Sequence, residues 1–269
     1  MCLAGECRVA VLNGAITARY QPIVDLVTGQ CVGAEALARW QRDEGELVSP
    51  ETFIVVAEDA GLMRQLTQAM LDAMLRDLSL FLRRQPQARV NLNLAPEDLE
   101  DDEFARELER RVSEENVPAG TIKLEITERA LVNSDTGRQM ISRLRKQGHE
   151  VAIDDFGTGY SSLSYLESFE LDTLKIDKSF VDTIGTEAVT SQVIHHVIEL
   201  AKSLELSIVA EGVETEEQAR WLQSQGVRYA QGYLYSEPLS AYDFQTFYRE
   251  KLDANVYEFD KATGQVAGT

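Results

Sequence analysis

VAIDDFGTGYSSL, from Val151 to Leu163, joins a short apolar strand to a glycine-rich loop through two adjacent carboxylates, Asp154 and Asp155. If the strand stays extended, these two side chains point to opposite faces, so a ligand that touches both must lie at the tip of the strand. A divalent cation suits that position. Taken alone, the segment is equally consistent with a turn of Asp and Gly residues that has no chemical role. The rest of the chain favours the metal site.

The segment lies within an alternation of expected strands and helices. Short apolar runs predict strands at residues 17–24, 31–40, 89–94, 121–127, 150–154, 172–176, 207–210 and 227–231. Helix signals begin at Ser49-Pro50 and continue in a stripe that ends at Pro86; further helices are expected at residues 102–115, 136–147, 189–204, 215–225 and 239–250. Six of these strands follow a βα rhythm, which favours a parallel barrel over an open sheet.

The first two expected strands are joined by a short turn around Thr28-Gly29, which predicts a hairpin. One strand of the barrel should therefore run antiparallel to the others. The expected fold is an α/β protein, a TIM-type (β/α)8 barrel with one antiparallel strand near the N-terminus, and the 269 residues suit one such barrel. We expect residues 1–14 to be a tail or linker remnant, 15–250 the barrel and 251–269 a polar tail.

Composition excludes several classes of protein. Asp and Glu number 45 against 26 Lys and Arg, and the formal charge of −19 argues against a surface that binds polymeric nucleic acid. Cys2, Cys7 and Cys31 match no zinc spacing, and a reducing compartment suits them. The sequence shows no long apolar run and no leader, so we expect a cytoplasmic protein without direct membrane insertion.

Polar side chains occupy one face of several expected strands, where the opposite face is aliphatic. A barrel strand beneath helices should be aliphatic on its outer side, so the polar faces should line the interior near its mouth. Burying so many unpaired charges is prohibitive, which indicates a metal site or a bound ligand. The residues on these faces, or directly after the strands, are Glu35, Leu37, Arg39, Asn91, Asn93, Glu125, Thr127, Lys175, Asp177, Glu211 and Gln231.

The kind of side chain in this pattern indicates the kind of metal. Carboxylates and an amide oxygen are hard ligands, which suit Mg²⁺ or Mn²⁺ better than zinc. The three histidines, His149, His195 and His196, fall in a turn or on a helix, away from the strand ends. We therefore assign them no catalytic role.

Glu35-Ala36-Leu37, followed by Arg39, resembles the signature of the EAL domain, the cyclic di-GMP phosphodiesterase family. The resemblance covers about residues 17–247. The chain departs from the family pattern at Ala95, where Ser is usual, and at Val55, where Pro is frequent; neither is a metal ligand. The other matching motifs are Gln21-Pro22-Ile23, Asn93-Leu94, Glu125-Ile126-Thr127-Glu128, the Asp154 to Leu163 loop, Lys175-Ile176-Asp177, Glu211-Gly212-Val213-Glu214, and Gln231-Gly232-Tyr233 with Pro238.

The resemblance implies a role for each matching residue. Two Mg²⁺ or Mn²⁺ ions would be held, with Asp154 bridging. The first ion would be bound by Glu35, Asn93, Glu125 and Asp154, and the second by Asp154, Asp155, Asp177 and Glu211. Lys175 would orient or deprotonate the attacking water, with Glu211 as the competing general base. Arg39 and Gln21 would bind phosphate and base, Leu37 would contact the substrate and Tyr233 would contact a guanine. Gln231 would help to order the site, and Glu128 and Glu214 would support it.

The activity implied is hydrolysis of one phosphodiester bond of cyclic di-GMP to linear pGpG, which lowers this bacterial second messenger. Two alternatives remain open: a receptor that binds cyclic di-GMP without turnover, and a structural module that docks on another protein. Both alternatives are typical of sequences in which the motifs are eroded. In this chain the metal ligands and the Asp-Asp-Phe-Gly loop are all present. The family also implies a homodimer, formed through the segment from Asp155 to Ser162.

Overall fold

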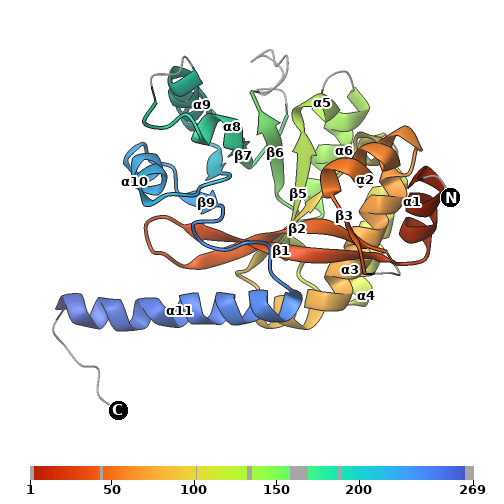
Figure 1. The fold of residues 1–269 in the computed structure, drawn as a ribbon, viewed down its shortest axis with the longest axis horizontal. Coiled ribbons are helices and arrows are strands. Elements are labelled where there is room, and N and C mark those ends of the chain that lie inside the picture. Colours follow the sequence, from red (N-terminus) through yellow and green to blue (C-terminus); the bar gives the residue numbers. More distant parts are fainter. Residues whose placement is uncertain are drawn as a thin grey trace.

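Eight strands close into a barrel in the computed structural model, which describes residues 3–42, 45–100, 102–131, 135–157, 169–186 and 190–263 (Figure 1). The barrel strands are β1 (Ile16–Asp25), β2 (Cys31–Gln41), β4 (Arg89–Asn93), β5 (Ile122–Thr127), β6 (Val151–Phe156), β7 (Thr173–Ile176), β8 (Ser207–Ala210) and β9 (Tyr229–Gln231). β1 pairs with both β2 and β9, and this double pairing closes the sheet. Each expected strand is present, so the prediction of a TIM-type barrel is confirmed.

β1 is the antiparallel strand. It forms a hairpin with β2, in which Gln21 lies opposite Glu35, and it runs antiparallel to β9, where Ile23 lies opposite Gln231. From β2 through β4 to β9 the neighbouring strands are parallel. The carboxyl ends of these parallel strands therefore meet at one end of the barrel, where their polar residues can converge.

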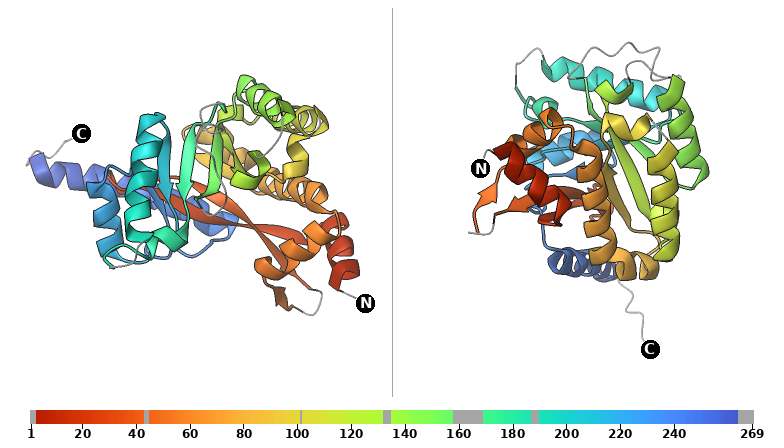
Figure 2. Two further views of the ribbon diagram at one scale, coloured as in Figure 1. Left: turned by 90° about the horizontal axis from the view of Figure 1, so that it is seen from above. Right: turned by 90° about the vertical axis from the view of Figure 1, so that its right-hand side faces the viewer.

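Helices cover the outside of the barrel, and Figure 2 shows α3, α4 and α6 along its outer side. The expected helices appear as α2 (Pro50–Asp59), α3 (Met63–Arg84), α4 (Asp102–Glu114), α6 (Asp135–Lys146), α9 (Thr190–Ser203), α10 (Glu216–Ser224) and α11 (Ala241–Thr263). The chain breaks between α2 and α3 because Gly61 has a φ of +64°, a conformation that glycine adopts without steric cost.

The hydrophobic core lies between the strands and these helices. On β4, Val90 and Leu92 are fully buried, and they alternate with Asn91 and Asn93, which occupy the opposite face. Leu124 and Ile126 repeat this arrangement on β5. The aliphatic faces therefore point outward to the helices and the polar faces point into the barrel, as the alternation predicts.

The termini differ from the expected tails. Residues Leu3–Leu12 form helix α1, which packs against α2 and α3 and buries Cys7, Ala10 and Val11. Exposed Val9 and Leu12 on the same helix blur its amphipathic pattern, so no helix was predicted there. α11 runs along the β1–β2 hairpin and continues past residue 250 to Thr263 (Figure 1). The domain boundaries stay predictions.

Short elements complete the fold: β3 (Leu47–Val48), η1 (Pro96–Leu99), η2 (Ala119–Thr121), α5 (Glu128–Leu131) and α8 (Lys178–Val181). β3 extends the sheet beyond β2, while η1, α5 and α8 directly follow barrel strands. Within the described residues, every helix is too short or too polar to cross a lipid bilayer.

Candidate metal and substrate site

The Lys175 ammonium lies at the centre of a buried acidic cluster at the carboxyl ends of the strands. Its side chain comes from β7 and is fully buried. The Nζ atom lies 3.2 Å from Glu35 Oε2, 2.9 Å from Glu125 Oε2, 3.2 Å from Asp154 Oδ1 and 2.5 Å from Glu211 Oε1. Four carboxylates from four strand ends therefore share one cation.

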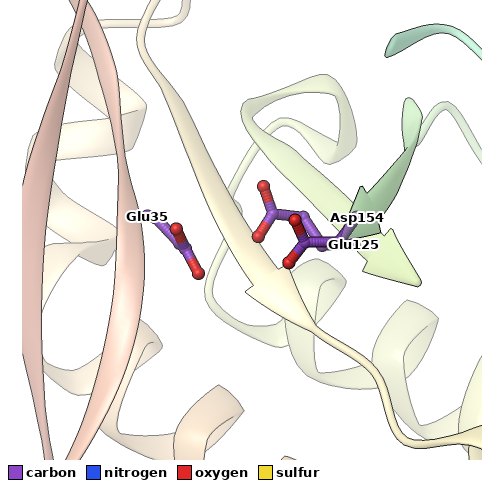
Figure 3. Close-up of side chains that lie close together, drawn as sticks. All are labelled: Glu35, Glu125 and Asp154. Atoms are coloured by element: carbon purple, nitrogen blue, oxygen red, sulfur yellow. The ribbon is translucent and has the colours of Figure 1, made fainter. Parts of the chain in front are cut away.

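Three of these carboxylates could also hold a metal ion. Glu35, Glu125 and Asp154 come from β2, β5 and β6, and Figure 3 shows that their carboxylates face one another. One oxygen from each lies within 4.8 Å of the other two. The sequence predicted that these residues would meet, and the register of the parallel strands brings them together.

Amide side chains fix the Glu35 carboxylate. Asn93 Nδ2 donates to Glu35 Oε1 at 2.8 Å, and Gln231 Nε2 donates to Glu35 Oε2 at 2.8 Å. Gln231 Nε2 also donates to Gln21 Oε1 at 2.9 Å. The two glutamines are thus joined to the acidic cluster through Glu35.

Glu125 has an amide partner that the sequence left without a role. Asn91 Nδ2 donates to Glu125 Oε1 at 2.6 Å, and both side chains are buried. The spacing of Asn91 from Asn93 was the signal that could have placed it in the site, because residues two apart on a strand share one face.

Burial and mutual repulsion raise the pKa of most acids in the cluster. For Glu125, burial is the largest cause, followed by the charge of Glu35, and the pKa lies well above its usual range. Burial likewise raises the pKa of Glu211 to about 8, although Lys175 opposes the shift. Burial also raises the pKa of Asp154. The protein alone therefore does not fully stabilise these groups in their ionised forms.

Glu35 and Lys175 shift toward their charged forms. Burial would raise the pKa of Glu35, but the Lys175 charge and the donors Gln231 and Asn93 outweigh it, so this pKa is lowered. Burial would lower the pKa of Lys175, but Asp154 and the other carboxylates outweigh it, so this pKa is raised well above the usual value. Lys175 therefore remains a cation.

The residues present fit a divalent cation. Four carboxylates around a single ammonium leave excess negative charge in a buried site when all are ionised. Glu125 Oε2 and Glu211 Oε1 are buried, and among the described residues each meets only the shared Lys175 ammonium, so each keeps a lone pair for a further ligand. Oxygen atoms with unused lone pairs are the ligands that Mg²⁺ and Mn²⁺ prefer.

The Asp154-Asp155 pair departs from the extended geometry assumed from the sequence. The pairing of β6 with β7 shifts register between Ile153 and Phe156, and Asp155 has a φ of +54°. Asp155 N donates to Asp154 Oδ1 at 2.9 Å. This bulge lets both carboxylates line the same cavity, and the left-handed conformation of a non-glycine residue marks local strain.

Three other predicted residues lie around the cluster and form hydrogen bonds with residues outside it. Asp177 Oδ1 caps α8 by accepting from Ser179 N at 3.0 Å and from Ser179 Oγ at 2.5 Å. Glu128 Oε2 accepts from Gly157 N at 3.0 Å. Glu214 Oε1 accepts from Lys178 Nζ at 2.7 Å. Residues 158–163 of the quoted loop lie outside the described part of the chain.

A cavity of about 590 Å³ opens between this cluster and helices α2 and α3. Leu37 and Arg39 line it together with Asp154 and Asp155, and its far wall is mostly apolar. Tyr233 follows β9 and is 62% exposed. The cavity thus combines a charged end with an apolar end, which suits a ligand that carries both phosphates and bases.

Comparison with known proteins identifies the family of this barrel. The model of the EAL domain matches residues 4–238, so the chain belongs to the EAL domain family. It is 44% identical over 243 residues to the probable cyclic di-GMP phosphodiesterase PdeB of Escherichia coli (strain K12), covering 90% of this chain and 46% of PdeB. The probable cyclic di-GMP phosphodiesterase PdeN of the same organism is 40% identical over 240 residues, covering 89% of this chain and 46% of PdeN.

Solved structures agree with this assignment. The PaMucR phosphodiesterase in complex with c-di-GMP superposes with a TM-score of 0.84 at 30% identity, covering 90% of this chain and 99% of that one. The EAL enzyme Bd1971, bound to cAMP and cyclic di-GMP, gives a TM-score of 0.87 at 30% identity. The match covers 91% of this chain and 68% of that one. The chain spans about half the length of the curated relatives PdeB and PdeN.

Proposed function

We propose that this chain hydrolyses one phosphodiester bond of cyclic di-GMP to linear pGpG, with two Mg²⁺ or Mn²⁺ ions as cofactors. The observation that carries the proposal is the cluster of Glu35, Glu125, Asp154 and Glu211 around Lys175 at the barrel mouth. Relatives with names that specify this activity, and a neighbouring structure with c-di-GMP bound, support the choice of substrate.

The acidic residues would hold the cations in two groups, as the family resemblance implies. Glu35, Asn93, Glu125 and Asp154 would bind one ion; Asp154, Asp155, Asp177 and Glu211 would bind the other. Bound divalent ions would offset the carboxylate charge, polarise a phosphate oxygen and lower the pKa of a coordinated water.

Lys175 and Glu211 would act on the attacking water in different ways: one would orient it and the other would accept its proton. Lys175 is held protonated by the surrounding carboxylates, so it can donate a hydrogen bond and orient the water but cannot accept its proton. Glu211 can accept a proton once it is ionised: burial raises its pKa to about 8 in the protein alone, and bound divalent cations would favour the ionised form. We therefore assign Glu211 as the base and Lys175 as the orienting cation.

The substrate would lie in the cavity that adjoins the cluster. Arg39 would face a phosphate, and Leu37 would contact the ligand beside it, since both line this cavity. Gln21 would also contact the ligand, and Gln231 would order the site, because it donates to both Gln21 and Glu35. Tyr233 would contact a guanine from its exposed position after β9, while Glu128 and Glu214 would support the loops.

Mass spectrometry of cyclic di-GMP incubated with the protein tests the proposal. We expect pGpG with Mg²⁺ or Mn²⁺ and none in excess chelator. Glu211→Gln should remove most of the product, and Glu199→Gln, on the exposed side of α9, should serve as the matched control. Unchanged cyclic di-GMP after incubation of the folded wild type with either ion would contradict the proposal.

Homodimer formation is a second part of the proposal, and it rests on family resemblance. Of the segment expected to mediate it, residues 155–157 are described, and Glu128 anchors Gly157 at its start. Sedimentation velocity should show a dimer; a fully active monomer at high concentration would contradict this. A cytoplasmic location likewise stays a prediction from the sequence.

A further inference from the structure

Asn91 occupies an unusual place inside the barrel. It lies on β4, level with Glu35 on β2 and with Lys123 on β5, and only 2% of it is exposed. Barrel interiors are usually filled at such positions by branched aliphatic side chains. Burying an amide costs free energy unless the amide is hydrogen-bonded, so the Asn91 side chain needs a hydrogen-bond partner inside the barrel.

That partner is the Glu125 carboxylate. Asn91 Nδ2 donates to Glu125 Oε1 at 2.6 Å, a short hydrogen bond to an acid. The other oxygen, Oε2, lies 2.9 Å from Lys175 Nζ, and among the described residues this ammonium, which three other carboxylates share, is its one partner. The two oxygens of Glu125 are thus distinguished: one faces the protein amide, and the other faces the acidic cluster.

We propose that Asn91 is a positioning residue that fixes Glu125 so that its Oε2 atom is presented to a bound cation. This inference rests on the metal site of the proposed function. A glutamate side chain has three rotatable torsions, and a ligand already held in one orientation loses less freedom when the ion binds. Partners of this kind commonly contribute 10–100-fold to metal affinity.

The neighbouring ligand Glu35 is also held by side-chain amides, but both of its oxygens accept from one. Its two oxygens accept from the amides of Asn93 and Gln231, at 2.8 Å each. In the described part of the chain, Asn91 is the one amide that donates to Glu125. Loss of Asn91 should therefore release Glu125, while Glu35 keeps its own donors.

Calorimetric titration of Mn²⁺ into metal-free protein tests the inference without depending on turnover. Asn91→Leu keeps the approximate size and removes the donor. Thr173→Val is the matched control, because Thr173 is 1% exposed inside the barrel and accepts from Lys123 Nζ at 3.0 Å, away from the acidic cluster. We expect Mn²⁺ affinity to fall about 10–100-fold in Asn91→Leu and to stay within about threefold of the wild type in Thr173→Val.

Kinetics supply a second readout that a merely structural role would not produce. Turnover by Asn91→Leu should require higher Mn²⁺ and recover toward the wild-type kcat as Mn²⁺ approaches saturation, with KM for cyclic di-GMP unchanged. Thr173→Val should show the wild-type Mn²⁺ dependence. If Asn91→Leu does not fold, Asn91→Ser, which also loses the 2.6 Å contact, is judged by the same criteria.

The outcomes separate this inference from the proposed function. Wild-type Mn²⁺ affinity in the Asn91 variant, or an equal loss in Thr173→Val, overturns the inference while leaving hydrolysis untouched. If Mn²⁺ affinity falls in the Asn91 variant but the wild type forms no pGpG, the inference is supported and the proposed function is refuted. A folded wild type that binds no Mn²⁺ overturns both.

Discussion

The two ends of the barrel handle charge in opposite ways. At the amino ends of the strands, Arg145 pairs with Asp172 through two hydrogen bonds of 2.8 and 3.1 Å, and Asp172 also accepts from Val151 N at 2.8 Å. Lys123 pairs there with Glu150 at 2.9 Å. At the carboxyl ends, four carboxylates share Lys175. One end is balanced by the protein itself, and the other is left with an excess of acid.

This difference indicates which charges serve stability and which serve binding. A paired acid with several donors stabilises the fold, and removing its partner leaves a charge without compensation. Crowded buried acids oppose folding unless a cation offsets them, so their retention at the barrel mouth is the expected cost of a binding site. The comparison makes predictions that differ in sign between the two ends.

The largest effect should come from Asp154, the proposed bridging ligand. Asp154→Ala should lower kcat/KM for cyclic di-GMP by about 1000-fold or more, because several kcal/mol of transition-state stabilisation depend on the bound ions. Asp172→Asn at the opposite end should stay within about threefold of the wild type. Steady-state kinetics with saturating Mn²⁺ measure both, and comparable losses would erase the distinction between the ends.

Stability should change in opposite directions for the same two aspartates. In chelator, Asp154→Asn should raise the free energy of unfolding by about 1 kcal/mol, because it removes one of the crowded charges. Asp172→Asn should lower that free energy by about 1–3 kcal/mol, because it weakens the contacts with Arg145 and Val151 N. Urea unfolding checks both signs. Destabilisation by Asp154→Asn in metal-free protein would count against the excess-charge account.

Asp98 is a buried acid that lies outside both charged groups. Its Oδ2 accepts from Ala95 N at 2.9 Å, and burial raises its pKa to about 6. The unfolded pKa is about 3.9, so the folded protein retains the proton that the unfolded chain loses between pH 4 and 6. Protonated Asp98 therefore contributes to the free energy of unfolding below pH 4, and this contribution is lost as the pH rises to about 6.

Asp98→Asn should therefore gain about 2 kcal/mol relative to the wild type between pH 4.5 and 6.5. Unfolding free energies at several pH values measure this difference, with exposed Glu100→Gln as the matched control. A constant difference between wild type and Asp98→Asn across this range would disprove the shifted pKa.

The strands and the central cluster were predictable because their signals repeat within the sequence. Alternation of Leu and Ile with Glu, Asn and Lys set both the strand faces and the residues that meet inside the barrel. The left-handed bulge at Asp155 was not predictable, because the surrounding tertiary structure, rather than local preference, selects that conformation. Asn91 lay on the predicted polar face, but its contact with Glu125 depends on the side-chain geometry across two strands.

If divalent cations complete the acidic mouth, binding of cyclic di-GMP must depend on them, and calorimetry measures that dependence. The titration is run in chelator, in Ca²⁺ and in Mn²⁺, and each sample is then analysed for pGpG. Binding should be weak in chelator, because the carboxylates repel the ligand phosphates. It should be measurable with little hydrolysis in Ca²⁺, which prefers longer and looser oxygen shells, and should lead to pGpG in Mn²⁺. Tight binding in chelator with no linear product in Mn²⁺ would contradict the metal-dependent hydrolysis and identify a cyclic di-GMP receptor instead.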